Sequence, residues 1–154
     1  MRIIARLIAA AAFATLALPA MAQDKPAGEK PLYERIGGYR GVAATVDDLV
    51  DRIYVNQTLN KNPALKAVHD DVGGKAAFKL ILATWVMENT GGPKVYFGRD
   101  MGKAHAHLAI TDREFTVIMH ECKETFYKFG VPEKEMGELM TALESYRKTV
   151  ATQP

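Results

Sequence analysis

Apolar side chains recur along most of the chain at steps of three and four residues, the spacing that gathers them on one face of an α-helix. The first such stripe follows Gly41 and consists of Val42, Val46, Leu49, Val50, Ile53 and Tyr54. A second helix is expected over 75–89; it is apolar around much of its circumference, which is typical of a helix buried on more than one side. Two further stripes, at 115–126 and 136–150, predict two more long helices.

Glycine and proline separate these segments. The Gly-Gly-Pro sequence at 91–93 ends the second helix, because glycine adopts the left-handed exit conformation and proline cannot continue the turn. Loops are expected at 70–74 and at 94–100, the second of them anchored by Tyr96 and Phe97.

A short helical segment at 101–108 precedes the third long helix. Met101, His105 and Leu108 share one of its faces, at steps of four and three. Thr111, with a glutamate three positions later, forms a capping box that opens the next helix. No segment alternates with period two, so the predicted fold class is all-α, with four substantial helices, several short ones, and strands absent or trivial.

The first 22 residues have the layout of a secretory signal: two arginines, an apolar run over 7–18, and a small-x-small cleavage site that ends at Ala22. The run is shorter than the roughly 20 apolar residues of a membrane span. No cysteine stands directly after the run, where a lipoprotein anchor would need one, so no membrane anchor is expected after cleavage. We therefore expect export to the periplasm, a flexible tether at 23–31 and one domain at 32–152.

Charge adds little to this picture. Cleavage after the predicted leader removes two of the 20 basic residues and none of the 18 acidic ones, which leaves 18 of each. A balanced chain gives no indication of a nucleic-acid or membrane partner. Cys122 is the only cysteine, so no internal disulfide can form, and its position on an apolar stripe predicts a buried packing role.

Histidine offers the most specific chemistry. His105 and His107 lie about 200° apart around a helix, so they cannot bind one metal from one helix face. The chain has no His-x-x-x-His pair, Cys-x-x-Cys or carboxylate cluster for a closed metal site, and no Cys-x-x-Cys-His for covalent haem. A b-type haem would therefore have to be held by its iron bond and by an apolar slot. On the residues alone, a packed core histidine without a ligand role remains the commoner outcome.

The residues available for such a slot fall into two groups. One wall would come from Phe78, Leu82 and Trp85. The other would come from Met101, His105, Leu108, Phe115 and Ile118.

Several short motifs follow one another in a characteristic order. They are Leu32-Tyr33-Glu34-Arg35-Ile36-Gly37-Gly38, Thr90-Gly91-Gly92-Pro93, Tyr96-Phe97-Gly98-Arg99-Asp100-Met101, Ala104-His105 and Ile110-Thr111. In this combination, from about residue 32 to 150, the chain resembles group I truncated haemoglobins. The resemblance implies a two-over-two helical sandwich, a shortened globin fold with haem between its third and fourth main elements.

The resemblance also implies roles for individual residues. His105 becomes the proximal iron ligand, and Tyr54 becomes the distal tyrosine that donates a hydrogen bond to iron-bound dioxygen. The alternative for Tyr54 is an ordinary packed aromatic residue. The chain departs from the family pattern at Phe78 and Leu82, where many members carry polar distal residues, and this implies a drier pocket.

Three further positions stay open. Val68 or His69 stands where the family usually has a phenylalanine. An inward-facing His69 would hydrogen-bond a ligand or take the sixth iron position, whereas the alternative is a solvated loop residue. Arg99 and Lys103 are candidates for the haem propionates, with exposed salt bridges elsewhere as the alternative.

The expected function is reversible binding of dioxygen or nitric oxide, with carbon monoxide as a further ligand, at five-coordinate ferrous iron. One alternative is a nitric oxide dioxygenase or weak peroxidase. It would need an external electron-donor reductase, because the chain encodes no reductase or flavin domain. The other is a non-haem helical module whose methionine-rich and aromatic faces bind another protein.

Overall fold

The computed structural model describes residues 28–153, so the predicted leader and most of the predicted tether lie outside the described residues. The elements are α1 (Leu32–Arg35), α2 (Gly38–Val55), the 3₁₀ turn η1 (Leu59–Lys61), α3 (Pro63–Asp70), α4 (Val72–Asn89), α5 (Met101–His105), the 3₁₀ turn η2 (Ala106–Leu108), α6 (Asp112–Lys128), α7 (Glu133–Glu144) and α8 (Arg147–Val150).

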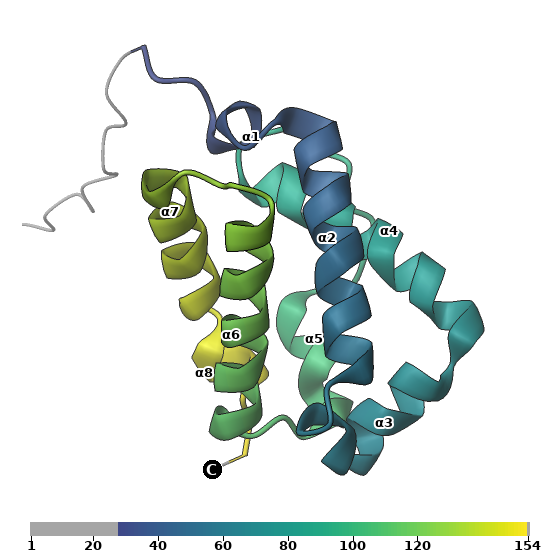
Figure 1. Ribbon diagram of the computed structural model, residues 1–154. Helices are drawn as coiled ribbons and strands as arrows, with labels where there is room; N and C mark the ends of the chain where they lie inside the picture. The colour runs from purple at the N-terminus through teal and green to yellow at the C-terminus, as the bar shows by residue number, and fades with distance from the viewer. Residues whose placement is uncertain (1–27, 154) are drawn as a thin grey trace, which may run out of the picture.

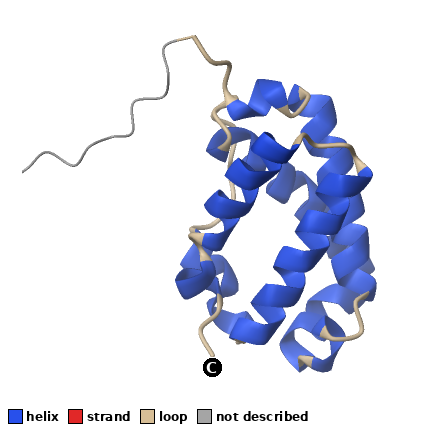
Figure 2. Cartoon of the chain, turned by 60° about the vertical axis from the view of Figure 1, so that its left-hand side comes forward, coloured by secondary structure: helices blue, strands red, loops and turns tan. Residues whose placement is uncertain are grey.

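Two pairs of long helices form the body of the domain. Helix α2 packs against α4, α6 packs beside α7, and α2 also contacts α6, so the two pairs lie one over the other (Figure 1). The short helix α3 lies at the end of the domain opposite α1, and α5 is seen alongside the lower half of α2 (Figure 1). Within residues 28–153 the only β-type pairing is an isolated bridge between Thr111 and Gln153 (Figure 2). The all-α prediction is confirmed.

The predicted apolar stripes form the core. On α2 the side chains of Val42, Val46, Val50 and Tyr54 are buried, one turn apart, against α4. Because residues four apart lie above one another on a helix, this run makes a continuous apolar ridge. The stripe of α6 is shared between two further clusters, one with α7 and one with the segment that follows His105.

The predicted loop at 70–74 is wrong, because α4 begins at Val72 and includes both glycines. The side chain of Asp71 accepts a hydrogen bond from the backbone N–H of Gly74, at 3.1 Å, and so caps the helix. A Cβ atom at Gly74 would come within 2.6 Å of the Asp71 carboxylate. Gly74, which suggested a loop, therefore leaves room for the Asp71 side chain to cap the helix.

Two other local expectations are corrected. Phe97 does not anchor the segment before α5, since 63% of it is exposed; Tyr96 does, through its hydroxyl, which donates to the carbonyl of Arg99 at 2.5 Å. The last predicted helix is divided into α7 and α8 at Ser145. The chain then returns to the start of α6, where the N–H of Thr152 donates to the carbonyl of Ile110 at 3.0 Å.

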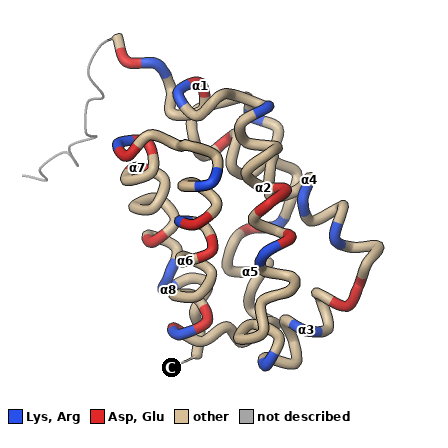
Figure 3. The backbone as a smooth tube through the Cα atoms, in the orientation of Figure 1, with Lys and Arg blue, Asp and Glu red and all other residues tan. Residues whose placement is uncertain are grey.

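Acidic and basic positions are interspersed along the helices (Figure 3), and one carboxylate ties α2 to α6. Asp48 accepts hydrogen bonds from Arg52 at 2.7 Å, from Thr125 at 3.2 Å and from the Lys128 ammonium group. Burial raises the pKa of Asp48, but the bonds from Lys128, Arg52 and Thr125 outweigh burial and hold that pKa below its usual value.

We expect Asp48→Asn to lower the free energy of unfolding by about 1–3 kcal/mol at pH 7, because charge-assisted hydrogen bonds across the helix interface are lost. A carboxyl whose pKa is lower in the folded state stabilises it above the unfolded pKa and loses this effect as the pH falls through the folded pKa. The difference between wild type and variant should therefore shrink below the usual aspartate pKa. Urea unfolding at several pH values measures it.

Asp47→Asn is the matched control, since Asp47 is exposed on the same helix and bonds only Lys79 across to α4. An exposed ion pair of this kind contributes less than about 1 kcal/mol. Equal losses for the two variants would contradict the assignment of Asp48 as the link between α2 and α6.

Candidate functional site

His105 lies at the end of a short helix that is fixed on both sides. The Asp100 side chain caps α5 by accepting hydrogen bonds from the N–H groups of Gly102 at 3.0 Å and Lys103 at 3.3 Å. After η2 the backbone of Ala109 enters the left-handed region, with φ of 47°, and turns the chain toward α6. The predicted capping box at the start of α6 is present, so this helix begins where the sequence placed it.

One ring nitrogen of His105 has a fixed partner. Its Nδ1 lies 2.8 Å from the backbone carbonyl oxygen of Met101, one turn earlier on the same helix. A carbonyl oxygen only accepts hydrogen bonds, so Nδ1 carries the hydrogen and Nε2 of the neutral ring carries the lone pair. This is the arrangement of a metal-binding imidazole whose other nitrogen is held by a second group.

The residues predicted for the His105 wall come together. Leu108 and Phe115 are buried in one cluster, against which Met101 and Ile118 pack half-buried. His107, by contrast, is exposed. Of the two histidines, His105 is the half-buried one, and it contacts the backbone of Met101, whose side chain packs on this cluster.

The residues predicted for the opposite wall lie on α4. Phe78 and Leu82 pack against the ridge of α2, beside Tyr54. The ring of Trp85 meets Tyr146 edge-on, with ring centroids 5.3 Å apart, and Tyr146 packs in turn against the cluster of Leu108 and Phe115. The two predicted walls thus belong to different clusters and are connected by the contact between Trp85 and Tyr146.

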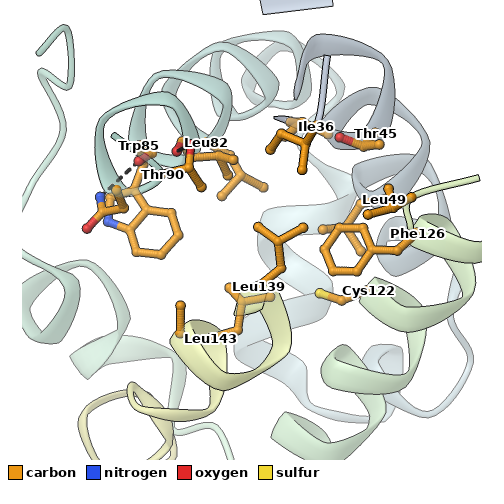
Figure 4. Close-up of a pocket in the computed structure, with 15 residues that line it drawn as sticks. Ile36, Thr45, Leu49, Leu82, Trp85, Thr90, Cys122, Phe126, Leu139 and Leu143 are labelled. Carbon is orange, nitrogen blue, oxygen red and sulfur yellow. Dashed lines mark hydrogen bonds between the residues drawn. The ribbon is translucent and has the colours of Figure 1, made fainter. Parts of the chain in front are cut away.

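An apolar cleft opens between α2, α4, α6 and α7 (Figure 4). Its lining residues are Ile36, Thr45, Val46, Leu49, Leu82, Trp85, Val86, Asn89, Thr90, Cys122, Phe126, Val131, Leu139, Ala142 and Leu143. The space among them is about 710 Å³, including the part open to solvent. Cofactor sites are typically lined mostly by apolar side chains, as this cleft is.

The polar groups of the cleft are turned toward the protein. The hydroxyl of Thr45 donates to the carbonyl of Gly41 at 2.9 Å, and that of Thr90 to the carbonyl of Val86 at 2.7 Å. Cys122 is buried as predicted, and burial raises the pKa of its thiol to about 12, so the sulfur stays protonated. The cleft therefore presents mainly carbon to anything it holds.

The cleft includes only part of the predicted site. Leu82 and Trp85 line it, but Phe78, Met101, His105, Leu108, Phe115 and Ile118 do not. The lining from α6 and α7, such as Phe126 and Leu139, was missed, although both residues lie on apolar helical stripes. Arg99 is exposed before α5, and Lys103 is exposed on it.

Tyr54 is buried at the end of α2 among aromatic and charged neighbours. Its ring centroid lies 4.6 Å from that of His69 and 6.3 Å from that of Phe78, and the Lys75 ammonium group lies 5.2 Å from it. Burial, and secondarily the charge of Asp71, raises the pKa of Tyr54, so its phenol remains a hydrogen-bond donor.

His69 is not the solvated loop residue of the alternative interpretation. It lies on α3, half-buried against the Tyr54 ring. Sequence reasoning left this position open because a histidine next to two aspartates is equally typical of an exposed turn.

The metal-binding side chains of the chain suit a metal that needs only one of them. Within residues 28–153 no three His, Cys, Asp or Glu side chains lie together so as to hold a metal ion. A single imidazole with an oriented Nδ1–H beside apolar clusters suits iron whose other ligands come from a porphyrin. Among the same residues, no helix has the length and apolar character needed to cross a membrane.

Comparison with known proteins gives a consistent result. The sequence profile of the family described as "Bacterial-like globin" matches residues 31–152. The chain is similar to the group 1 truncated hemoglobin GlbN of Mycolicibacterium paratuberculosis, with 22% identity over 132 residues, which cover 86% of this chain and 92% of the relative.

Solved structures share the fold. The 2/2 hemoglobin of a Synechococcus species, in the cyanomet state and with covalently attached heme, superposes with a TM-score of 0.70 at 22% identity, covering 80% of this chain and all (100%) of that one. The truncated hemoglobin of Tetrahymena pyriformis in its Fe(III) form gives 0.69 at 20% identity, covering 79% and 97%.

Proposed function

Because this chain belongs to the bacterial-like globin family, we propose that it binds a b-type haem and, at the haem iron, a diatomic gas in a reversible manner. The observation that carries the proposal is the imidazole of His105, whose Nδ1–H is held by the Met101 carbonyl at 2.8 Å. The similarity to a relative named as a group 1 truncated hemoglobin supports assignment to group I. We propose His105 as the proximal residue.

Haem supplies, when bound, an iron centre that binds dioxygen, nitric oxide or carbon monoxide. The task of His105 is to donate the Nε2 lone pair to that iron while Met101 keeps the ring from turning. Holding the Nδ1 hydrogen on a carbonyl also makes Nε2 a better donor. With His105 as its one protein ligand, the iron would remain able to bind the gas.

Retention rests on apolar burial, since the chain carries no Cys-x-x-Cys-His motif for covalent attachment. Phe78, Leu82 and Trp85 from α4 would cover one face, while Met101, Leu108, Phe115 and Ile118 flank His105 on the other. Burying apolar surface contributes about 25 cal/mol per Å², so a flat porphyrin held by these side chains needs few polar contacts. Arg99 and Lys103 are both exposed, and we propose them as partners for the haem propionates.

Tyr54 is the proposed donor to the bound gas. Its phenol stays protonated, and its neighbour Phe78 brings no competing hydrogen bond. Leu82 belongs to the same apolar cluster, while the His69 ring and the Lys75 ammonium group border Tyr54 on its other sides. A phenol donor at the edge of an apolar cluster favours a ligand that develops negative charge, as dioxygen does.

Turnover, as opposed to binding, needs a second protein. Converting nitric oxide and dioxygen to nitrate consumes one electron, which an external reductase would have to supply. We propose that the mature protein acts in the periplasm; the signal-like order of basic, apolar and small residues at the N-terminus supports this.

Hemin titration of the mature protein tests the proposal. We expect uptake of one haem per chain, a Soret band, and distinct ferric, ferrous and carbonmonoxy spectra. A colourless protein that refuses hemin would instead favour the helical interaction module. Rapid mixing of the oxygenated form with nitric oxide separates binding from catalysis: one nitrate per haem without a reductase-driven cycle identifies a scavenger.

A further inference from the structure

We propose that His69 and Asn60 form a positioning pair that holds the Tyr54 phenol in place and thereby sets the strength of its hydrogen bond to a bound diatomic ligand. This inference rests on the proposed role of Tyr54. It assigns a function to two residues that the haem-binding proposal does not use.

Asn60 connects the end of α2 to the His69 ring. Its Nδ2 donates to the backbone carbonyl of Tyr54 at 3.0 Å, which fixes the orientation of the amide. The other amide atom, Oδ1, therefore faces Nδ1 of His69, at 2.6 Å. Because this oxygen only accepts, His69 carries its hydrogen on Nδ1, and turning the ring over would break the bond.

The fixed imidazole forms one side of the Tyr54 site. The two rings are tilted by 31° with centroids 4.6 Å apart, so they are in contact. Phe78 stacks with the same phenol ring, and the Lys75 ammonium group lies near it while bonded to Asp51 at 2.6 Å. The phenol is thus confined by groups on α3 and α4.

The frame that carries the pair reaches the His105 side of the molecule. Leu65, one turn before His69 on α3, is buried in the same cluster as Leu108 and Ile110. Asn62 caps α3 by accepting from the N–H of Ala64 at 2.9 Å, and its own Nδ2 donates to the carbonyl of Leu108 at 3.0 Å. The helix that presents His69 is therefore anchored to the segment that follows His105.

The surroundings keep His69 suited to this role. Burial lowers the pKa of His69, so the ring stays neutral and its Nδ1–H remains the donor to Asn60. A side chain that holds Tyr54 in this way differs from one that touches the ligand itself. A side chain that only holds Tyr54 affects ligand binding only while the Tyr54 hydroxyl is present. A side chain that touches the ligand affects binding with or without that hydroxyl.

A double-mutant cycle on the haem-loaded mature protein distinguishes a His69 that positions Tyr54 from a His69 that contacts the ligand itself. Oxygen dissociation rates and the C–O stretching frequency of the carbonmonoxy form are measured for Asn60→Ala and His69→Leu, each alone and combined with Tyr54→Phe. We expect each single substitution to speed oxygen dissociation about three- to tenfold and to shift the C–O stretch. With Tyr54→Phe present, the same substitutions should change the rate by less than about twofold.

Asn60→Ala leaves both rings in place, so it gives an answer even if His69→Leu fails to fold. Ala67→Ser, an exposed change on the same helix, is the matched control and should leave both readouts at wild-type values. Equal effects with and without the Tyr54 hydroxyl would show that His69 acts on the ligand directly and overturn the proposal. Wild-type rates in both single variants would also overturn it.

The role of Tyr54 and the binding of haem through His105 can be tested separately. If Tyr54→Phe alone leaves the oxygen rate unchanged, the role of Tyr54 is lost and this inference with it. Haem uptake and ligation by His105 would still stand, because hemin titration and the spectra read them out independently.

Discussion

His105→Ala is expected to remove the axial imidazole from haem bound to this protein. His105 is half-buried, and its Nδ1–H already has a partner in the carbonyl of Met101, which leaves Nε2 for iron. The ferrous spectrum should lose the features of histidine ligation. Haem should dissociate more than about 100-fold faster, since loss of a mere supporting partner of a metal ligand already costs about 10- to 100-fold.

His107→Ala is the matched control, because His107 lies two residues away on the exposed side. It should bind haem with unchanged spectra. Free imidazole added to the His105→Ala protein should restore much of the wild-type ferric spectrum by filling the space of the lost ring. A wild-type spectrum in His105→Ala without added imidazole would assign the axial bond to another side chain and contradict the proposal.

The second large effect is expected at Tyr54. Tyr54→Phe keeps the ring between His69 and Phe78 and removes only the hydroxyl. A hydrogen bond to a charged acceptor contributes about 1.5–3 kcal/mol, so oxygen should dissociate about 10- to 150-fold faster. Displacement of oxygen by carbon monoxide in a stopped-flow instrument measures the rate, while carbon monoxide association should change much less.

Tyr39→Phe controls for the loss of any phenol on α2, since 63% of Tyr39 is exposed at the other end of that helix. Its oxygen rate should equal that of wild type. If Tyr54→Phe behaves in the same way, Tyr54 is a packed aromatic residue, the alternative that the sequence left open.

Local patterns predicted most of the helices. The ridge of α2 from Val42 to Tyr54 followed from residues four apart, and the capping box at Thr111 followed from two residues three apart. Both depend on contacts between residues three or four positions apart, and such contacts can be predicted from the sequence. The start of α4 was missed because Gly74 is equally typical of a loop and of a capped first turn.

The candidate site was predicted only in part. His105 and its apolar neighbours follow from helical spacing, and the motifs around them resemble one family. The lining of the cleft by Phe126 and Leu139 depends on how α6 and α7 pack over α2 and α4, which no local pattern specifies. The same holds for the division of the two predicted walls between clusters that meet through Trp85 and Tyr146.

The order of apolar and polar residues alone was enough to establish an all-α chain, its main helices and one histidine set apart from its neighbour, because these properties repeat over distances of a few residues. The place of His69 required the folded chain. Its bond to Asn60 spans nine positions, and its contact with Tyr54 joins α3 to α2. Side chains from separate helices meet only where packing brings those helices together, so their partnership is a property of the tertiary structure.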